Sequence, residues 1–203
     1  MRVRRLVLWR GLDSWRTEAV TFELGAEGIV AAGTQVGVDP LAYRLDYRLN
    51  AGPAFVTQSL TIDVTGESWA RHMRLLRHAD GTWSCDAQED GKAPLPPPGG
   101  DVEAVSGAFD CDLARSPLTN LMPVRRHRLH ERPGQADFLM AWVSVPDLAL
   151  HPSQQHYEHV RRDDDHAVVR YVGRHRDFVG DLVFDRDGVV EMYPDLAARV
   201  RAP

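Results

Sequence analysis

The stretch Gly107-Ala-Phe-Asp-Cys-Asp-Leu-Ala-Arg-Ser-Pro-Leu-Thr-Asn-Leu-Met-Pro-Val-Arg-Arg126 decides the predicted fold, because it alone starts like a helix. Ser116 suits the N-cap, and Pro117 suits the first helical position, where no intrahelical N–H is needed. Apolar residues then recur on one face at i, i+3 and i+4, namely Leu118, Leu121 and Met122. Pro123 disfavours helical geometry at the residue before it, so we expect the helix to end or kink there.

Charged residues flank this short helix. Asp110 and Asp112 precede its positive end, and Arg125 and Arg126 follow at its negative end, which suits the helix macrodipole. One interpretation is structural, with the charges neutralising the helix ends and forming ion pairs. The other is a polar mouth for a sugar or phosphate headgroup, since guanidinium groups donate through a planar fork and carboxylates accept from hydroxyls. Composition alone favours the structural interpretation.

The remaining residues show no catalytic signature. Thr119 and Asn120 are poor mid-helix residues whose side chains compete for backbone partners, which indicates a local role without identifying it. Cys111 lies between two aspartates that raise the pKa of a thiol, so a buried structural cysteine is favoured over a nucleophile. The nine histidines lack zinc-site spacing and are expected mainly at the surface. We predict no metal, no cofactor and no catalytic residue.

Strand and turn patterns surround the helix. Residues 43–49 alternate strictly between apolar and polar, the clearest strand pattern in the chain. Residues 90–100 are rich in proline and predict a loop, and residues 154–161 are polar and ambiguous. Further strands are expected within residues 3–9, 16–28, 29–38, 55–64, 73–76, 83–85, 137–145, 168–172, 178–185 and 189–192. Many short strands with one helix are typical of a barrel, roll or sandwich.

Length and composition predict one globular domain, residues 1–203. The formal net charge of -5 gives no general affinity for nucleic acid or for anionic membranes. The apolar run before Arg10 is shorter than the roughly 7–15 residues of a signal peptide, and no stretch approaches the roughly 18–20 residues of a membrane span. We therefore expect a cytoplasmic protein without stable membrane insertion, in which Cys85 and Cys111 are free thiols.

Several stretches together resemble the glycolipid-binding family, long known as a domain of unknown function. The central match consists of Gly107, Asp110-Cys-Asp112, Ser116-Pro-Leu-Thr-Asn120, Pro123 and Arg125-Arg126. Flanking matches are Trp9, Tyr43, Tyr47, Val145-Pro-Asp-Leu148, Gln155, Tyr157, Asp187-Gly188 and Tyr193-Pro194. The chain departs from the family pattern at Ala108, where Cys is frequent, at Leu118, where Phe is usual, and at Leu121-Met122, where Thr-Leu is usual.

The resemblance implies a mainly β fold, a spiral β-roll in which a large curled antiparallel sheet wraps around one short central α-helix, usually as a homodimer. The glycolipid label of the family rests on likeness to periplasmic lipoprotein carriers, which is an analogy at the level of the fold. It implies a non-enzymatic binding protein for a glycolipid or acyl chain, held in a cavity between sheet and helix. Candidate ligand-binding residues are Asp110, Asp112, Thr119, Asn120, Arg125, Arg126 and Tyr157.

Two other functions stay open at this point. A hydrolase or isomerase would use Asp110 or Asp112 as a base together with a nearby histidine, although none has characteristic spacing. A structural or dimerisation module would use the central motif only to fill the roll. The predicted absence of a signal peptide also counts against a literal carrier role, because carriers of this kind act outside the cytoplasm.

Overall fold

The computed structural model describes residues 2–174 and 177–201. Its strands form one 14-stranded sheet in the order β7-β6-β5-β4-β3-β2-β1-β14-β13-β12-β11-β10-β9-β8. The first half of the chain contains β1 (Val3–Gly11), β2 (Arg16–Leu24), β3 (Ile29–Gly37), β4 (Tyr43–Ala51), β5 (Thr57–Thr65), β6 (Trp69–Arg77) and β7 (Trp83–Gly91). The second half contains β8 (Asp110–Leu113), β9 (Gln135–Val143), β10 (Leu150–Arg162), β11 (His166–Gly173), β12 (Phe178–Asp185), β13 (Val190–Tyr193) and β14 (Ala197–Val200). Neighbouring strands run antiparallel except β8 and β9.

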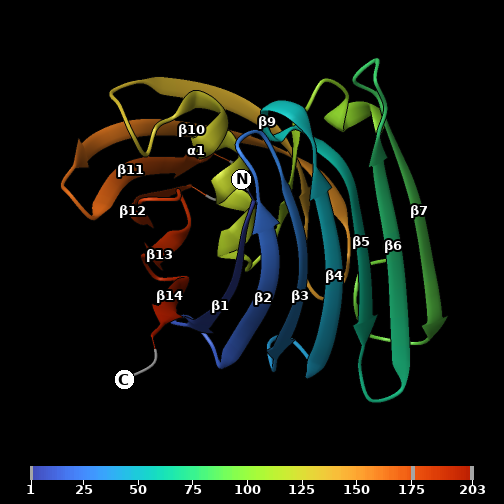
Figure 1. The fold of residues 1–203 in the computed structure, drawn as a ribbon. Helices are drawn as coiled ribbons and strands as arrows, with labels where there is room; N and C mark the ends of the chain where they lie inside the picture. Colours follow the sequence, from blue (N-terminus) through green and yellow to red (C-terminus); the bar gives the residue numbers. More distant parts are fainter. Residues whose placement is uncertain (1, 175–176, 202–203) are drawn as a thin grey trace.

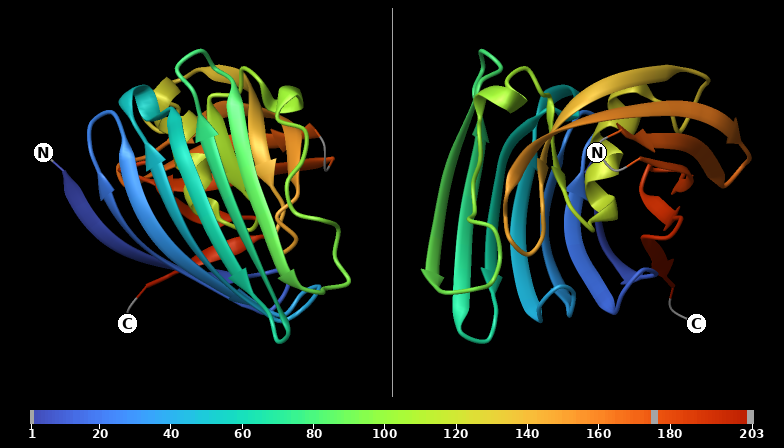
Figure 2. Two further views of the ribbon diagram at one scale, coloured as in Figure 1. Left: turned by 90° about the vertical axis from the view of Figure 1, so that its right-hand side faces the viewer. Right: turned by 180° about the vertical axis from the view of Figure 1, so that it is seen from behind.

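The sheet curls so that its two halves face each other and enclose the helical segment, as Figures 1 and 2 show. Strand β14 joins the two halves by pairing with β1 and β13. The edge strand β8 lies inside the roll and contacts β5, since the Cys111 N–H of β8 donates to Thr57 Oγ1 of β5 at 3.0 Å. The predicted mainly β fold, a curled sheet around one short helix, is confirmed.

The helical segment begins as a 3₁₀ turn, η3 (Pro117–Asn120), and continues as α1 (Leu121–His127). Of the two expectations for Pro123, an end or a kink, the end is wrong, because α1 continues to His127. This proline is the third residue of α1, where its missing N–H removes no hydrogen bond within α1. Ser116 occupies the N-cap position but its side chain makes no capping bond. The predicted apolar face is confirmed, since Leu118, Leu121 and Met122 are buried.

Two glycines of β3 let tyrosines of β4 lie across the inner face of the sheet. Gly33 is paired with Tyr47 and Gly37 with Tyr43. A Cβ atom on Gly33 would lie 2.4 Å from the Tyr47 ring, and one on Gly37 would lie 2.8 Å from the Tyr43 ring. Only glycine therefore leaves room for both rings, which reach over β3 toward β2.

Strands β8, β10 and β14 were not predicted as strands, and β6 and β7 extend well beyond the predicted residues 73–76 and 83–85. Strand β10 is 13 residues long and includes the polar stretch 154–161, in which the residues facing inward bind the central motif. Strands β8 and β14 have four residues each, too few for a periodic pattern.

Cys85 and Cys111 are free thiols, as predicted. In the part of the chain that the structure describes, helices are too short or too polar to cross a membrane.

Candidate functional site

A buried ion pair ties the last turn of α1 to β8. Arg126 Nη1 donates to Asp110 Oδ2 at 2.8 Å, and Nη2 donates to the other carboxylate oxygen. The same guanidinium donates to the carbonyl oxygens of Ala54 at 2.8 Å and Phe55 at 2.9 Å, both in η1 (Pro53–Phe55). Burial raises the pKa of Asp110, although the arginine acts in the opposite direction. These two predicted site residues therefore bond to each other.

A second buried network joins the helical segment to β8 and β10. Thr119 Oγ1 donates to Asp112 Oδ1 at 2.7 Å, and Gln155 Nε2 donates to Asp112 Oδ2 at 2.7 Å. The Tyr157 hydroxyl lies 2.9 Å from Asn120 Oδ1 and 3.1 Å from Gln155 Oε1. Burial raises the pKa of Tyr157 well above its usual value, so the phenol keeps its proton and donates.

A third buried group was not predicted. Glu18 on β2 accepts hydrogen bonds from the Tyr47 hydroxyl at 2.6 Å and from Ser116 Oγ at 2.7 Å. Burial raises the pKa of Glu18 to about 7, against the effects of these hydrogen bonds and of a nearby arginine. The sequence offered a signal, because Glu18 has the same inward phase as the apolar residues within 20–24.

The helical segment fills the interior beside these networks. The hollow that touches Asp112, Ser116 and Asn120 has a volume of about 10 Å³. That volume is close to the minimum for one water molecule, and an acyl chain does not fit there. Among the described residues, the side chains bonded to Asp110 and Asp112 are those of Arg126, Thr119 and Gln155, and no histidine is one of them.

An open cleft of about 460 Å³ lies at the carboxyl end of α1. It is lined by residues from three segments, including Glu27, Phe55, Arg125, Arg126, Arg128 and Glu131. The Arg125 guanidinium lies 5.0 Å from the centre of the Phe55 ring, and its Nη1 donates to the Asp187 carbonyl at 2.6 Å. Burial lowers the pKa of Arg125, yet a guanidinium remains charged at neutral pH.

The cleft offers both donors and acceptors. Arg128 Nε donates to Glu131 Oε2 at 2.6 Å, so a guanidinium group and a carboxylate lie side by side in the cleft. Guanidinium donors beside carboxylate acceptors suit a group rich in hydroxyls that also carries negative charge. Arg125 and Arg126 were predicted site residues, whereas Glu27, Phe55, Arg128 and Glu131 were not, because separate turns bring them together. The other predicted site residues bond in the interior, namely Asp110, Asp112, Thr119, Asn120 and Tyr157.

The sheet is curled and open, and it surrounds a short helical segment whose polar residues bond in the interior. An open cleft lies at the carboxyl end of this segment. Together these features define a mainly β roll with a helical plug. The chain belongs to the family described as "Putative glycolipid-binding", whose model matches residues 6–199. It is similar to the crystal structure of a DUF1089 family protein from Pseudomonas aeruginosa, with a TM-score of 0.68 and 26% identity. The similarity covers 90% of this chain and 92% of that chain. No curated protein matches this chain.

Proposed function

We propose that this protein is a non-enzymatic binding protein for an amphipathic ligand, such as a glycolipid, whose polar headgroup binds in the cleft at the end of α1. One observation carries the proposal: Arg125 and Arg126, the last two residues of the family motif, line an open hollow of about 460 Å³. Most of the rest of the motif is buried, apart from the exposed Gly107 and Phe109 and the partly buried Asp112 and Arg115. We treat residues 1–203 as the single domain that performs this function.

The chemistry of the cleft supports a headgroup that contains hydroxyls. Arg125 and Arg128 can donate to phosphate or sugar oxygens, and Glu27 and Glu131 can accept from hydroxyls. The acyl part of the ligand does not fit the hollow beside Asp112, which is too small for it. The family description, "Putative glycolipid-binding", is consistent with a ligand of this kind.

We also propose a homodimer in the cytoplasm, the state and compartment that the family resemblance and the sequence suggest. Free thiols at Cys85 and Cys111 support a reducing compartment. Sedimentation equilibrium of the purified chain tests the dimer, and a monomer at all concentrations would contradict it.

Native mass spectrometry of protein purified without detergent, followed by solvent extraction, tests the function. We expect an adduct that extracts as a lipid. Arg125→Gln and Arg128→Gln should each lower its occupancy, because each removes a donor from the cleft. Arg161→Gln, an exposed arginine of β10, is the matched control and should leave occupancy unchanged. A chain that shows no adduct, and takes up none when incubated with each class of lipid, would overturn the proposal.

A further inference from the structure

The outer face of the sheet carries exposed apolar residues around β1. Leu6 and Leu8 alternate with buried residues on this strand and point away from the core, with Leu6 64% exposed. Val200 of β14 lies directly opposite Leu8, so it shares this face, and the exposed Val30 of β3 lies two strands away from β1. Between them lie small side chains such as Ala32. We call this surface the outer β1 face.

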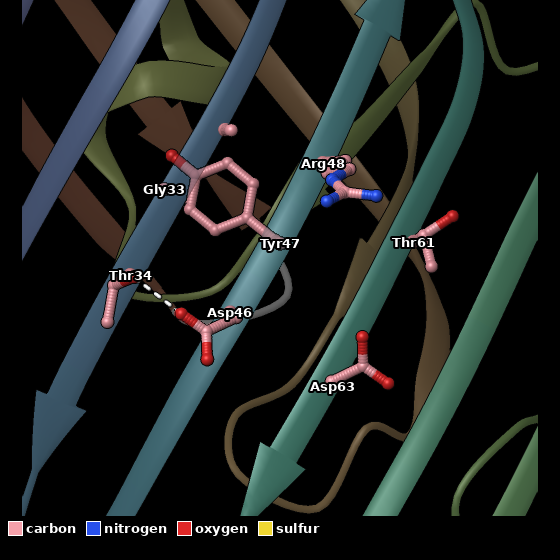
Figure 3. Close-up of a pocket in the computed structure, with 8 residues that line it drawn as sticks. Gly33, Thr34, Asp46, Tyr47, Arg48, Thr61 and Asp63 are labelled. Atoms are coloured by element: carbon pink, nitrogen blue, oxygen red, sulfur yellow. Dashed lines mark hydrogen bonds between the residues drawn. The ribbon is translucent and has the colours of Figure 1, made fainter.

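Arginines frame the outer β1 face. Arg4 and Arg10 project from the two ends of β1 on the same side as Leu6 and Leu8. Arg48 of β4 lies in the same cross-strand row as Leu6, and Figure 3 shows its guanidinium beside the sheet. Within residues 2–174 and 177–201, no carboxylate lies at ion-pair distance from Arg4, Arg10 or Arg48.

The acidic residues of this face already have partners. Glu23 lies 3.7 Å from Arg2, and Asp46 lies 3.0 Å from Arg44 Nε. Asp46 also accepts from Thr34 Oγ1 at 2.5 Å, as the dashed line in Figure 3 shows. Arg4 lies directly opposite Glu23, which also pairs with Arg2, so Arg10 and Arg48 carry most of the unpaired positive charge beside the apolar residues, although the whole chain has a net charge of -5.

A hollow of about 650 Å³ lies between two of these arginines. Arg4 and Arg48 both line it, and Val30 and Ala32 form part of its floor. The hydroxyls of Ser59 and Thr61 also lie in its lining and add donors, while the Glu23 carboxylate lines it on the Arg4 side. This space is open and large enough for a negatively charged headgroup beside Arg48, and Leu6 of β1 lies next to it, opposite the lining residue Thr21.

We propose that the outer β1 face docks on an anionic lipid surface, with Leu6 and Leu8 in contact with the bilayer interface and Arg4, Arg10 and Arg48 at the level of the anionic headgroups. Apolar residues with basic neighbours bind such surfaces through buried apolar area and attraction to the negative leaflet. A second copy of this chain is a poorer partner, because a two-fold symmetric contact would place the unpaired arginines of one copy against those of the other. This docking is separate from the cleft at Arg125.

Sedimentation with vesicles of phosphatidylcholine, with or without an equal part of phosphatidylglycerol, tests the inference. We expect the anionic vesicles to bind at least about tenfold more tightly, and this preference to fall at high salt. Arg4→Gln, Arg10→Gln and Arg48→Gln combined should remove the preference. Leu6→Thr with Leu8→Thr, which keeps strand propensity, should weaken binding to the anionic vesicles.

Two control variants test whether vesicle binding is specific to the outer β1 face. Val160→Thr with Arg161→Gln changes an exposed valine and arginine of β10, five strands away from β1, and should bind vesicles like the wild type. Arg125→Gln should also bind vesicles normally, even if the headgroup proposal fails. Equal sedimentation with both vesicle types, or none with either, would overturn the inference. A dimer that Leu6→Thr with Leu8→Thr converts to monomer, without vesicle binding, would show a contact between copies instead.

Discussion

At the scale of the residue, Glu18 is a carboxyl group set among apolar neighbours on the inner face of β2. It is 3% exposed, and hydroxyl groups from β4 and from the start of the helical segment donate to it. Desolvation opposes its charge more strongly than these donors favour it, so its pKa rises to about 7. The folded protein therefore binds a proton here at pH values where the unfolded chain releases it.

Glu18→Gln should remove one pH-dependent part of stability. The folded pKa of about 7 exceeds the value of 4.5 for an unperturbed carboxyl, so the stabilising contribution is complete below pH 4.5 and is lost as pH rises through 7. The loss is about 3 kcal/mol at pH 8. Urea unfolding of the wild type and of Glu18→Gln from pH 4 to 8 measures this loss. The difference between their free energies of unfolding removes the contributions of the other titrating groups, which both proteins share. A constant difference would contradict the prediction.

At the scale of the element, the helical segment is held by side-chain hydrogen bonds to two strands. Thr119 and Asn120 reach β8 and β10 through Asp112 and Tyr157. The apolar face of the segment meets the opposite wall of the roll, where it belongs to the main core. The two sets of contacts fix both sides of a helix that is too short to be stable by itself.

Thr119→Ala and Asn120→Ala should each lower the free energy of unfolding by about 0.5–1.5 kcal/mol, because each removes one of the hydrogen bonds of its partner, Asp112 or Tyr157. Ligand occupancy in native mass spectrometry should stay unchanged in both variants, since neither side chain lines the cleft. Thr61→Ala, on the outer face of β5, serves as the control and should change stability little. If either variant loses ligand occupancy while its free energy of unfolding is unchanged, the substituted residue belongs to the binding site and the prediction is wrong.

At the scale of the whole molecule, β14 joins the two halves of the roll. It pairs with β1 from Leu8↔Val200 to Gly11↔Ala197, and it also pairs with β13. Without this strand the first seven strands would have an unpaired edge at β1, and the remaining strands would have another at β13. The last strand therefore converts two curled sheets into one.

Removal of residues 197–203 should give a protein that aggregates and unfolds without a cooperative transition, because both new edges are exposed. Removal of residues 202–203 is the control and should leave the thermal transition in place. Light scattering after size-exclusion chromatography, together with thermal unfolding followed by circular dichroism, distinguishes the two truncations. A monodisperse shortened protein with a sharp transition would show that the halves do not depend on β14.

The sequence by itself determined much of the architecture. The strict alternation of residues 43–49 placed β4 with its apolar side inward, and the Ser116-Pro117 signal located the helical segment. The motif from Gly107 to Arg126, together with matches along the chain from Trp9 to Pro194, also identified the family. The strand and helix signals are local, since each depends on residues within a few positions of one another.

Only the tertiary structure decided which polar residues face a ligand. Asp110 and Arg126 are 16 residues apart and bond to each other, while Glu27, Phe55 and Arg128 meet at one cleft from separate turns. The face around Leu6 likewise depends on cross-strand pairing with residues of β14 and β3. Contacts between distant segments depend on how the sheet curls, and that curvature depends on the whole set of strands rather than on the pattern of any one.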